Sequence, residues 1–205
     1  MQKISILKNP IIYIFSVCLV IEIAVWISPE LIHYLAVFTD IWYKEPWTLV
    51  TSMFTHSNSD IWHLLFNMVT LYFLGNYLYN MIGAKRFLIV YFLAGIIGNL
   101  FFILIFQLLN PDTIGATVGA SGAIFGIGAT LAVLKPMSKI IIFPIPVPIP
   151  MWVGIVGLLI IMTFISYSGA SIAWEAHLGG AIIGAIYGVF LRQVTFKYYY
   201  RNKHY

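Results

Sequence analysis

Charge is scarce in this chain. Of its 205 residues, 9% are Asp, Glu, Lys or Arg, whereas 61% are apolar and 17% are aromatic. Soluble domains carry about 25% charged residues, so the composition excludes an ordinary soluble protein. The mean hydropathy of +0.93 agrees with this. The chain is therefore predicted to be a membrane protein.

Cysteine is nearly absent as well. The single one, Cys18, lies inside an apolar run, which excludes a disulfide framework and a cysteine metal site. The sequence also lacks a convincing internal repeat, so a transporter built of two related halves gains no support. Short segments that alternate apolar and polar residues, as a membrane β-barrel requires, are missing too.

Long apolar runs are what the sequence has instead. A helix needs roughly 17 to 25 apolar residues to cross about 30 Å of hydrocarbon. Six runs approach this length, at 10–28, 61–81, 87–109, 117–134, 148–167 and 171–191. The first is long for a signal peptide and has no clear small-x-small cleavage pattern. We therefore predict an all-α membrane protein, a single domain over 1–205 with six transmembrane helices.

The basic residues predict the orientation, because they gather on the cytoplasmic side of membrane proteins. They flank every second connection and both chain ends: Lys3, Lys8, Lys85, Arg86, Lys135, Lys139, Arg192, Lys197, Arg201 and Lys203. Both termini should therefore be cytoplasmic. This asymmetry accounts for the net charge of +4, so no nucleic-acid partner is expected. The connection 29–60 would lie outside, where Trp42, Tyr43 and Trp47 suit a loop partly embedded among lipid headgroups.

Four polar side chains fall within one shallow layer near the outer face. Ser121 belongs to the stretch GASGAIFG and follows the predicted outer end of its helix by four residues, about 6 Å. By the same rise, His177 lies about 9 Å deep. His63 and Asn67 lie about 4 and 10 Å deep and share a helix face.

Each of these residues also has an ordinary explanation. A serine in a membrane helix usually bonds the carbonyl four residues before it or eases packing, and a histidine near a helix end can simply meet water. Their common depth favours a different interpretation. A hydroxyl, an imidazole and two further hydrogen-bond donors are the components of acyl transfer by a serine nucleophile.

Glycines beside these residues predict close helix packing. Gly180 and Gly184 share a helix face with His177 at the spacing that lets two backbones approach. A second stripe lies beside the face that carries Ser121 and Phe125, and it comprises Gly115, Gly119, Gly122 and Gly126. Pressing the two helices together would bring the hydroxyl and the imidazole within hydrogen-bond reach.

No carboxylate is placed to orient the imidazole of His177. Glu175 precedes it by two residues and points about 200° away around the helix. Glu22 is near the middle of the first predicted span, which is too deep. The sequence therefore predicts a dyad of Ser121 and His177 without an acidic third member.

Three motifs, in this order, resemble the rhomboid intramembrane serine proteases: WHLLFNM at 62–68, GASGAIFG at 119–126 and AHLGG at 176–180. The resemblance implies a six-helix rhomboid bundle that cleaves other membrane proteins in or near a transmembrane segment. It implies transmembrane substrates in the lipid bilayer as partners, and no metal or cofactor. The compact form resembles members of prokaryotic plasma membranes.

The resemblance also implies roles for single residues. Ser121 would be the nucleophile and His177 its general base and later acid. His63 and Asn67, with the backbone N–H of Ser121, would stabilise the oxyanion. Phe125 would occupy the aromatic position that packs beneath the catalytic histidine.

The chain departs from the family's pattern in its first outer loop. Thr48 stands where arginine is common, and the stretch from His56 to His63 is slightly longer than usual. Two other functions stay open. One is a non-proteolytic rhomboid-like protein that binds transmembrane helices; the other, a channel or transporter, is disfavoured because the inner half of the spans carries few polar residues.

Overall fold

The structure is a computed structural model that describes residues 9–57, 60–142, 145–168 and 172–201. It is mostly helical, with two short two-stranded sheets. The longer helices are α1 (Pro10–Ile27), α4 (Ile61–Thr70), α5 (Asn76–Ile82), α6 (Ala84–Leu109), α7 (Ser121–Leu134), α8 (Met151–Tyr167) and α9 (Trp174–Arg201). A π-helical turn, Leu71–Gly75, joins α4 to α5.

Several helices are long and apolar enough to cross a membrane. Among the described residues these are α1, α6 and the 174–194 part of α9, and α7 and α8 are shorter apolar helices. The described residues are thus mostly helical, with several apolar helices, as a membrane protein of the predicted class requires. The predicted sixth span was to begin at 171, which lies outside the described residues, and α9 begins at Trp174.

Local sequence explains where two of these helices begin. The Asn9 side chain accepts a hydrogen bond from the Ile11 amide, and a proline occupies the first position of α1. The Asp60 carboxylate accepts one from the Trp62 amide at the start of α4. Both are N-caps that satisfy backbone donors which a helix start leaves free.

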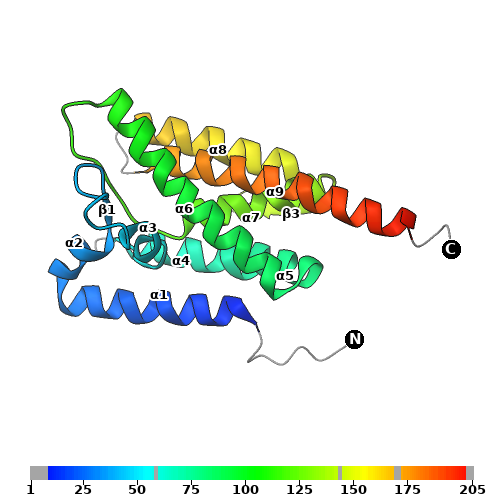
Figure 1. Ribbon diagram of the computed structural model, residues 1–205, viewed down its shortest axis with the longest axis horizontal. Helices are drawn as coiled ribbons and strands as arrows, with labels where there is room; N and C mark the ends of the chain where they lie inside the picture. The colour runs from blue at the N-terminus through cyan, green and yellow to red at the C-terminus, as the bar shows by residue number, and fades with distance from the viewer. Residues whose placement is uncertain (1–8, 58–59, 143–144, 169–171, 202–205) are drawn as a thin grey trace.

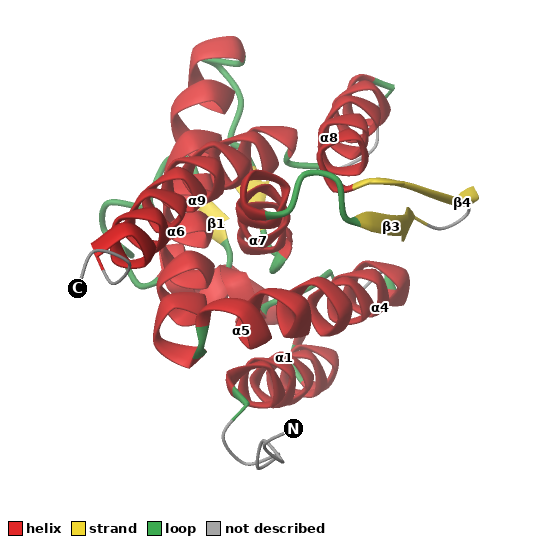
Figure 2. Ribbon diagram, turned by 90° about the vertical axis from the view of Figure 1, so that its right-hand side faces the viewer, coloured by secondary structure: helices red, strands yellow, loops and turns green. Residues whose placement is uncertain are grey.

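Helix α7 lies in the centre of the bundle and contacts α4, α6, α8 and α9 (Figures 1 and 2). Its ten consecutive residues from Gly122 to Leu131 are all buried. The outer helices instead expose large apolar side chains, including Ile23, Phe73 and Phe164. This distribution is expected where the outer helices face lipid and one helix is enclosed by protein.

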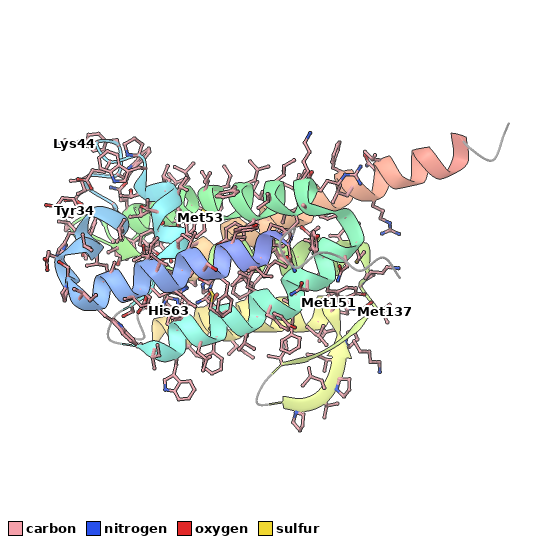
Figure 3. All side chains as sticks on the ribbon, turned by 90° about the horizontal axis from the view of Figure 1, so that it is seen from below. Tyr34, Lys44, Met53, His63, Met137 and Met151 are labelled. Carbon is pink, nitrogen blue, oxygen red and sulfur yellow. The ribbon has the colours of Figure 1, made fainter. Side chains whose placement is uncertain are left out.

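The two ends of the bundle carry different irregular segments. In Figure 3, Tyr34 and Lys44 mark one end, and Met137 and Met151 mark the other. The first end holds the connection 28–60, which contains α2 (Ile32–Leu35), β1 (Val37–Phe38), α3 (Thr48–Thr51) and two 3-10 turns, Pro29–Leu31 and Ser52–Phe54. The second end holds an antiparallel hairpin of β3 (Lys139–Ile142) and β4 (Ile145–Pro150).

Strand β1 pairs with β2 (Ala116–Thr117), so the outer connection is fixed to the segment that precedes α7. This pairing corrects one predicted boundary. The span was expected to begin at Thr117, but the chain is extended there and α7 begins only at Ser121. Gly115 and Gly119 therefore precede the helix and are not part of its packing face.

Helices α7 and α9 touch through their backbones. A Cβ atom added at Gly180 would overlap the carbonyl of Gly122, and one added at Gly184 would overlap the carbonyl of Gly126. The Thr130 hydroxyl lies in the same seam and hydrogen-bonds the Gly184 carbonyl at 2.8 Å. The predicted contact between the two glycine stripes is therefore present from Gly122 onward.

We expect Gly184→Ala to destabilise the fold, because the added methyl group meets a backbone carbonyl that cannot rotate away. Overpacking of this kind costs about 1–3 kcal/mol. Gly157→Ala in α8 is the matched control, since a Cβ there meets nothing within 4 Å. Thermal unfolding in detergent micelles should show a lower Tm for Gly184→Ala and an equal or higher Tm for Gly157→Ala. Equal Tm values for all three proteins would contradict the backbone contact.

Candidate active site

The site begins with a hydrogen bond between two helices. The Ser121 hydroxyl lies 2.8 Å from Nε2 of His177. Ser121 is the first residue of α7, and His177 is in the first turn of α9. The glycine contacts between α7 and α9 place the two helix starts side by side, which short side chains require if they are to meet.

Phe125 fixes the plane of the His177 ring. The two rings stack with centroids 4.6 Å apart and an angle of 27° between their planes. Phe125 follows Ser121 by one helical turn, so both lie on the same face of α7. Nδ1 of His177 is buried without a hydrogen-bond partner among the described residues, and Glu175 does not bond it. Within this part of the chain, serine and histidine form a pair and not a triad.

Gly119 shapes the approach of the chain to Ser121. Its φ of +123° is a conformation that favours glycine. A Cβ at this position would lie 2.8 Å from Nε2 of His63, so the histidine ring lies against the glycine backbone. The amide of Gly119 donates to the carbonyl of Ser52 at 2.8 Å. A backbone hydrogen bond to the connection 28–60 thus holds the turn that precedes Ser121.

Asn67 follows His63 by one turn of α4. Its amide donates to the backbone carbonyl of His63 at 2.7 Å, and its side chain is buried. An asparagine amide has two N–H donors, so one of them is left for another acceptor. The structure brings His63 next to the Gly119 turn. Among the described residues it shows no hydrogen bond from either side chain to Ser121 itself.

Asn99 and Ser52, which the sequence did not mark as candidate site residues, hold the segment that contacts the Gly119 turn. The Asn99 amide in α6 donates to the Leu49 carbonyl and to the Ser52 hydroxyl, both at 2.9 Å. Asn99 therefore holds the segment whose carbonyl binds Gly119. An amide within a long apolar run was the available signal, because such residues usually face the bundle interior and bond a neighbouring segment.

Thr48, the position where an arginine was expected from the resemblance, is buried and caps a local turn. Its hydroxyl donates to the Glu45 carbonyl at 2.7 Å. The neighbouring Thr51 donates to the Leu35 carbonyl at 2.9 Å. Hydroxyl-to-backbone bonds hold this part of the loop in the present chain.

A second buried polar group lies behind His63. The His56 ring contacts the His63 ring edge-on, with centroids 5.2 Å apart and an angle of 67° between the planes. Burial, and to a smaller degree the neighbouring His63, lower the pKa of His56 to about 3, so its ring is neutral near pH 7. Glu22 of α1 lies against the backbone amide of His56. Glu22 therefore lies beside the connection 28–60, although α1 continues for five more residues, to Ile27.

The arrangement has the parts needed for attack on a carbonyl group. A hydroxyl bonded to a buried imidazole can lose its proton as it attacks. The backbone N–H groups at the start of α7 have no partner within the helix, and they suit an oxygen that becomes negative. Among the described residues, no three His, Cys, Asp or Glu side chains gather as a metal site would require.

Comparison with known proteins identifies the family. The rhomboid domain matches residues 43–194, which is most of the chain. This chain belongs to the rhomboid family. The match includes α4, α6, α7, α8 and the part of α9 that carries His177, but it begins after α1.

Named rhomboids with similar sequences differ in what their names state. Rhomboid protein 1, mitochondrial, from Saccharomyces cerevisiae is 32% identical over 73% of this chain and 43% of its own length. Rhomboid-like protease 3 from Toxoplasma gondii is 29% identical over 67% of this chain and 49% of its own length. Inactive RHOMBOID-like protein 8 from Arabidopsis thaliana is 37% identical over 44% of this chain and 24% of its own length. The chain thus spans less than half the length of these rhomboids.

We expect Gly119→Ala to disturb the site, because the methyl group is strained at this φ and collides with the His63 ring. Gly83→Ala is the matched control: Gly83 has a φ of +80°, but a Cβ there meets nothing within 4 Å. Both substitutions should lower the Tm through backbone strain. Only Gly119→Ala should reduce labelling of Ser121 by a fluorophosphonate probe, read by mass spectrometry of the Ser121 peptide. Equal labelling of the two variants would show that the contact between Gly119 and His63 does not affect the reactivity of the Ser121 hydroxyl.

Proposed function

We propose that this rhomboid is an intramembrane serine endopeptidase that cleaves transmembrane or juxtamembrane segments of other membrane proteins. The observation that carries the proposal is the 2.8 Å hydrogen bond between Ser121 and His177, which come from two different helices. A hydroxyl at the first residue of a helix has no helical carbonyl four residues before it to bond. Here the hydroxyl instead meets a buried imidazole whose ring plane is fixed by Phe125.

The proposed reaction follows the general scheme of serine acyl transfer. Oγ of Ser121 attacks the scissile carbonyl while Nε2 of His177 takes its proton. The C–N bond then breaks, and His177 gives this proton to the leaving amine. A water molecule attacks the acyl-enzyme by the same route and releases Ser121. These steps balance without a metal or a cofactor.

His63 and Asn67 are proposed to stabilise the tetrahedral oxyanion together with the backbone N–H of Ser121. The contact of His63 with the Gly119 turn supports this, because that turn leads directly into the attacking residue. Asn67 has one N–H left beyond its bond to the His63 carbonyl. Preorganised donors of this kind supply much of the rate enhancement in acyl transfer.

The proposed topology has six membrane spans, with both termini in the cytoplasm and the site near the outer face. The stretch 61–82 would be one span, because its α-helical parts are joined by a π turn without a loop. We also propose one domain over 1–205, since Ile11, Ile14 and Cys18 of α1 belong to the main apolar core. A site near the outer face would give the hydrolytic water a short path, because the bilayer centre holds almost none.

The membrane in which this rhomboid works is a separate proposal. We propose a prokaryotic plasma membrane, as the resemblance of the sequence motifs implied. The name of the yeast rhomboid places that protein in mitochondria. Its partners are proposed to be transmembrane proteins that reach the site through the lipid phase, past the exposed apolar faces of the outer helices.

A non-proteolytic rhomboid that only binds transmembrane helices is the second candidate. One similar protein is named as inactive, so membership of the family does not by itself establish cleavage. Labelling by a fluorophosphonate separates the two functions. An enzyme should be labelled at Ser121 in a reaction that requires His177, whereas a binding protein should not be labelled.

Ser121→Ala should abolish cleavage and leave the fold intact, because it removes the nucleophile and, among the described residues, no side-chain hydrogen bond other than that to His177. Purified protein in lipid vesicles would be incubated with single-span substrates, and the new termini would be mapped by mass spectrometry. The Tm of the variant serves as the control for folding. Cleavage at the wild-type rate by Ser121→Ala would refute the proposed mechanism.

Asn67→Ala should lower kcat about 10 to 1000-fold, the usual cost of one oxyanion donor, with little change in KM. Asn110→Ala is the matched control, because the Asn110 amide makes the same bond to the carbonyl four residues before it, at the exposed end of α6. Its kcat should equal that of the wild type. A kcat for Asn67→Ala within twofold of the wild type would exclude Asn67 from the oxyanion site.

A further inference from the structure

Glu22 is a buried acid in an apolar helix. Its side chain is 2% exposed, and neither carboxylate oxygen has a hydrogen-bond partner among the described residues. An unpaired carboxyl group costs several kcal/mol when it leaves water, and ionisable residues inside membrane proteins are usually functional. The proposed dyad of Ser121 and His177 makes no use of it.

The His56 side chain is also buried without the hydrogen bonds that its polar atoms require. Its ring is 0% exposed, and neither ring nitrogen has a hydrogen-bond partner among the described residues. Since the ring is neutral, one nitrogen carries a proton to donate and the other accepts. A carboxyl group satisfies either nitrogen: as an acid it donates to one, and as a carboxylate it accepts from the other.

The two residues are neighbours. The Glu22 carboxyl group lies near the backbone amide of His56 and near the indole of Trp26, one turn later on α1. The His56 ring in turn packs edge-on against His63. Figure 3 shows His63 at the start of α4, beside α1. The three side chains thus connect α1 with the turn that precedes Ser121.

We infer that Glu22 and His56 hydrogen-bond each other and that this pair positions the His63 ring for its work on the oxyanion. A hydrogen bond at one nitrogen holds the His56 ring in one orientation. The His56 ring in turn limits the orientation of the His63 ring that it contacts. Glu22 and His56 are positioning residues, since neither touches the substrate or Ser121. The inference rests on the proposed protease function, and it extends the site to α1, which precedes the matched region 43–194.

This assignment predicts effects on kcat and not on KM, because a displaced oxyanion donor weakens the transition state alone. Glu22→Leu and His56→Phe keep the approximate volume and remove the polar atoms. Each should lower kcat about 10-fold, part of the loss of about 100-fold or more that removal of a donor causes. Glu22→Gln can still bond a neutral ring, so it should recover most of the kcat lost in Glu22→Leu.

Stability separates positioning from a structural role. If Glu22 and His56 bond each other, Glu22→Leu leaves the buried His56 ring without its partner and should lower the Tm, whereas the double variant Glu22→Leu/His56→Phe removes both polar groups and should recover the Tm. Cys18→Ala is the matched control, because Cys18 is buried one turn before Glu22 on the same helix. It should leave kcat unchanged while lowering the Tm through the lost packing.

The decisive experiment is a double-mutant cycle with His63→Ala, with kcat and KM measured in vesicles for a substrate that the wild type cleaves. If the pair acts through His63, Glu22→Leu and His56→Phe should have no further effect in the His63→Ala background. Equal fold-losses in both backgrounds, or losses in KM and Tm alone, would overturn the inference. If His56→Phe does not fold, the comparison of Glu22→Leu with Glu22→Gln still decides it. Cleavage that persists in Ser121→Ala would instead refute the protease proposal, and the inference with it.

Discussion

The direct backbone contact between α7 and α9 is the constraint on which the site depends. Serine and histidine side chains are short, so two helices that carry them must lie closer together than ordinary side chains permit. The carbonyls of Gly122 and Gly126 occupy the space where Cβ atoms of Gly180 and Gly184 would be. This contact sets the 2.8 Å separation of hydroxyl and imidazole, and helix packing is thus the source of the site's geometry.

Much of the fold could be predicted from sequence because lipid imposes a simple rule on helix length and composition. The apolar runs located the main helices, and the glycine spacing indicated which two would touch. The same information could not predict the positive φ of Gly119, because this conformation accompanies the pairing of β1 with β2 and the bond to Ser52. That pairing joins segments far apart in the chain, which local periodicity does not detect.

The candidate site shows a similar division. Ser121, His177, His63 and Asn67 could be identified from the sequence as candidates because their depths along the predicted helices agree. The role of Asn99 could not be identified, because an amide in an apolar run does not reveal which group it bonds. For Glu22 the sequence could not indicate a neighbour, because His56 follows it by 34 residues and belongs to the next connection. The rotation of α1 about its axis, which turns Glu22 toward His56, depends on tertiary packing alone.

Helix α7 has one more property with a physical consequence. Its 14 residues span about 21 Å, well short of the roughly 30 Å of hydrocarbon in a bilayer. Protein encloses it on its sides, so lipid cannot thin around it to compensate for the mismatch. The missing length has to be made up at the ends of α7, where the segment of β2 precedes it and the hairpin of β3 and β4 follows it. A helix too short to cross a membrane can thus stand at the centre of the bundle because its neighbours, and not lipid, cover it along its length.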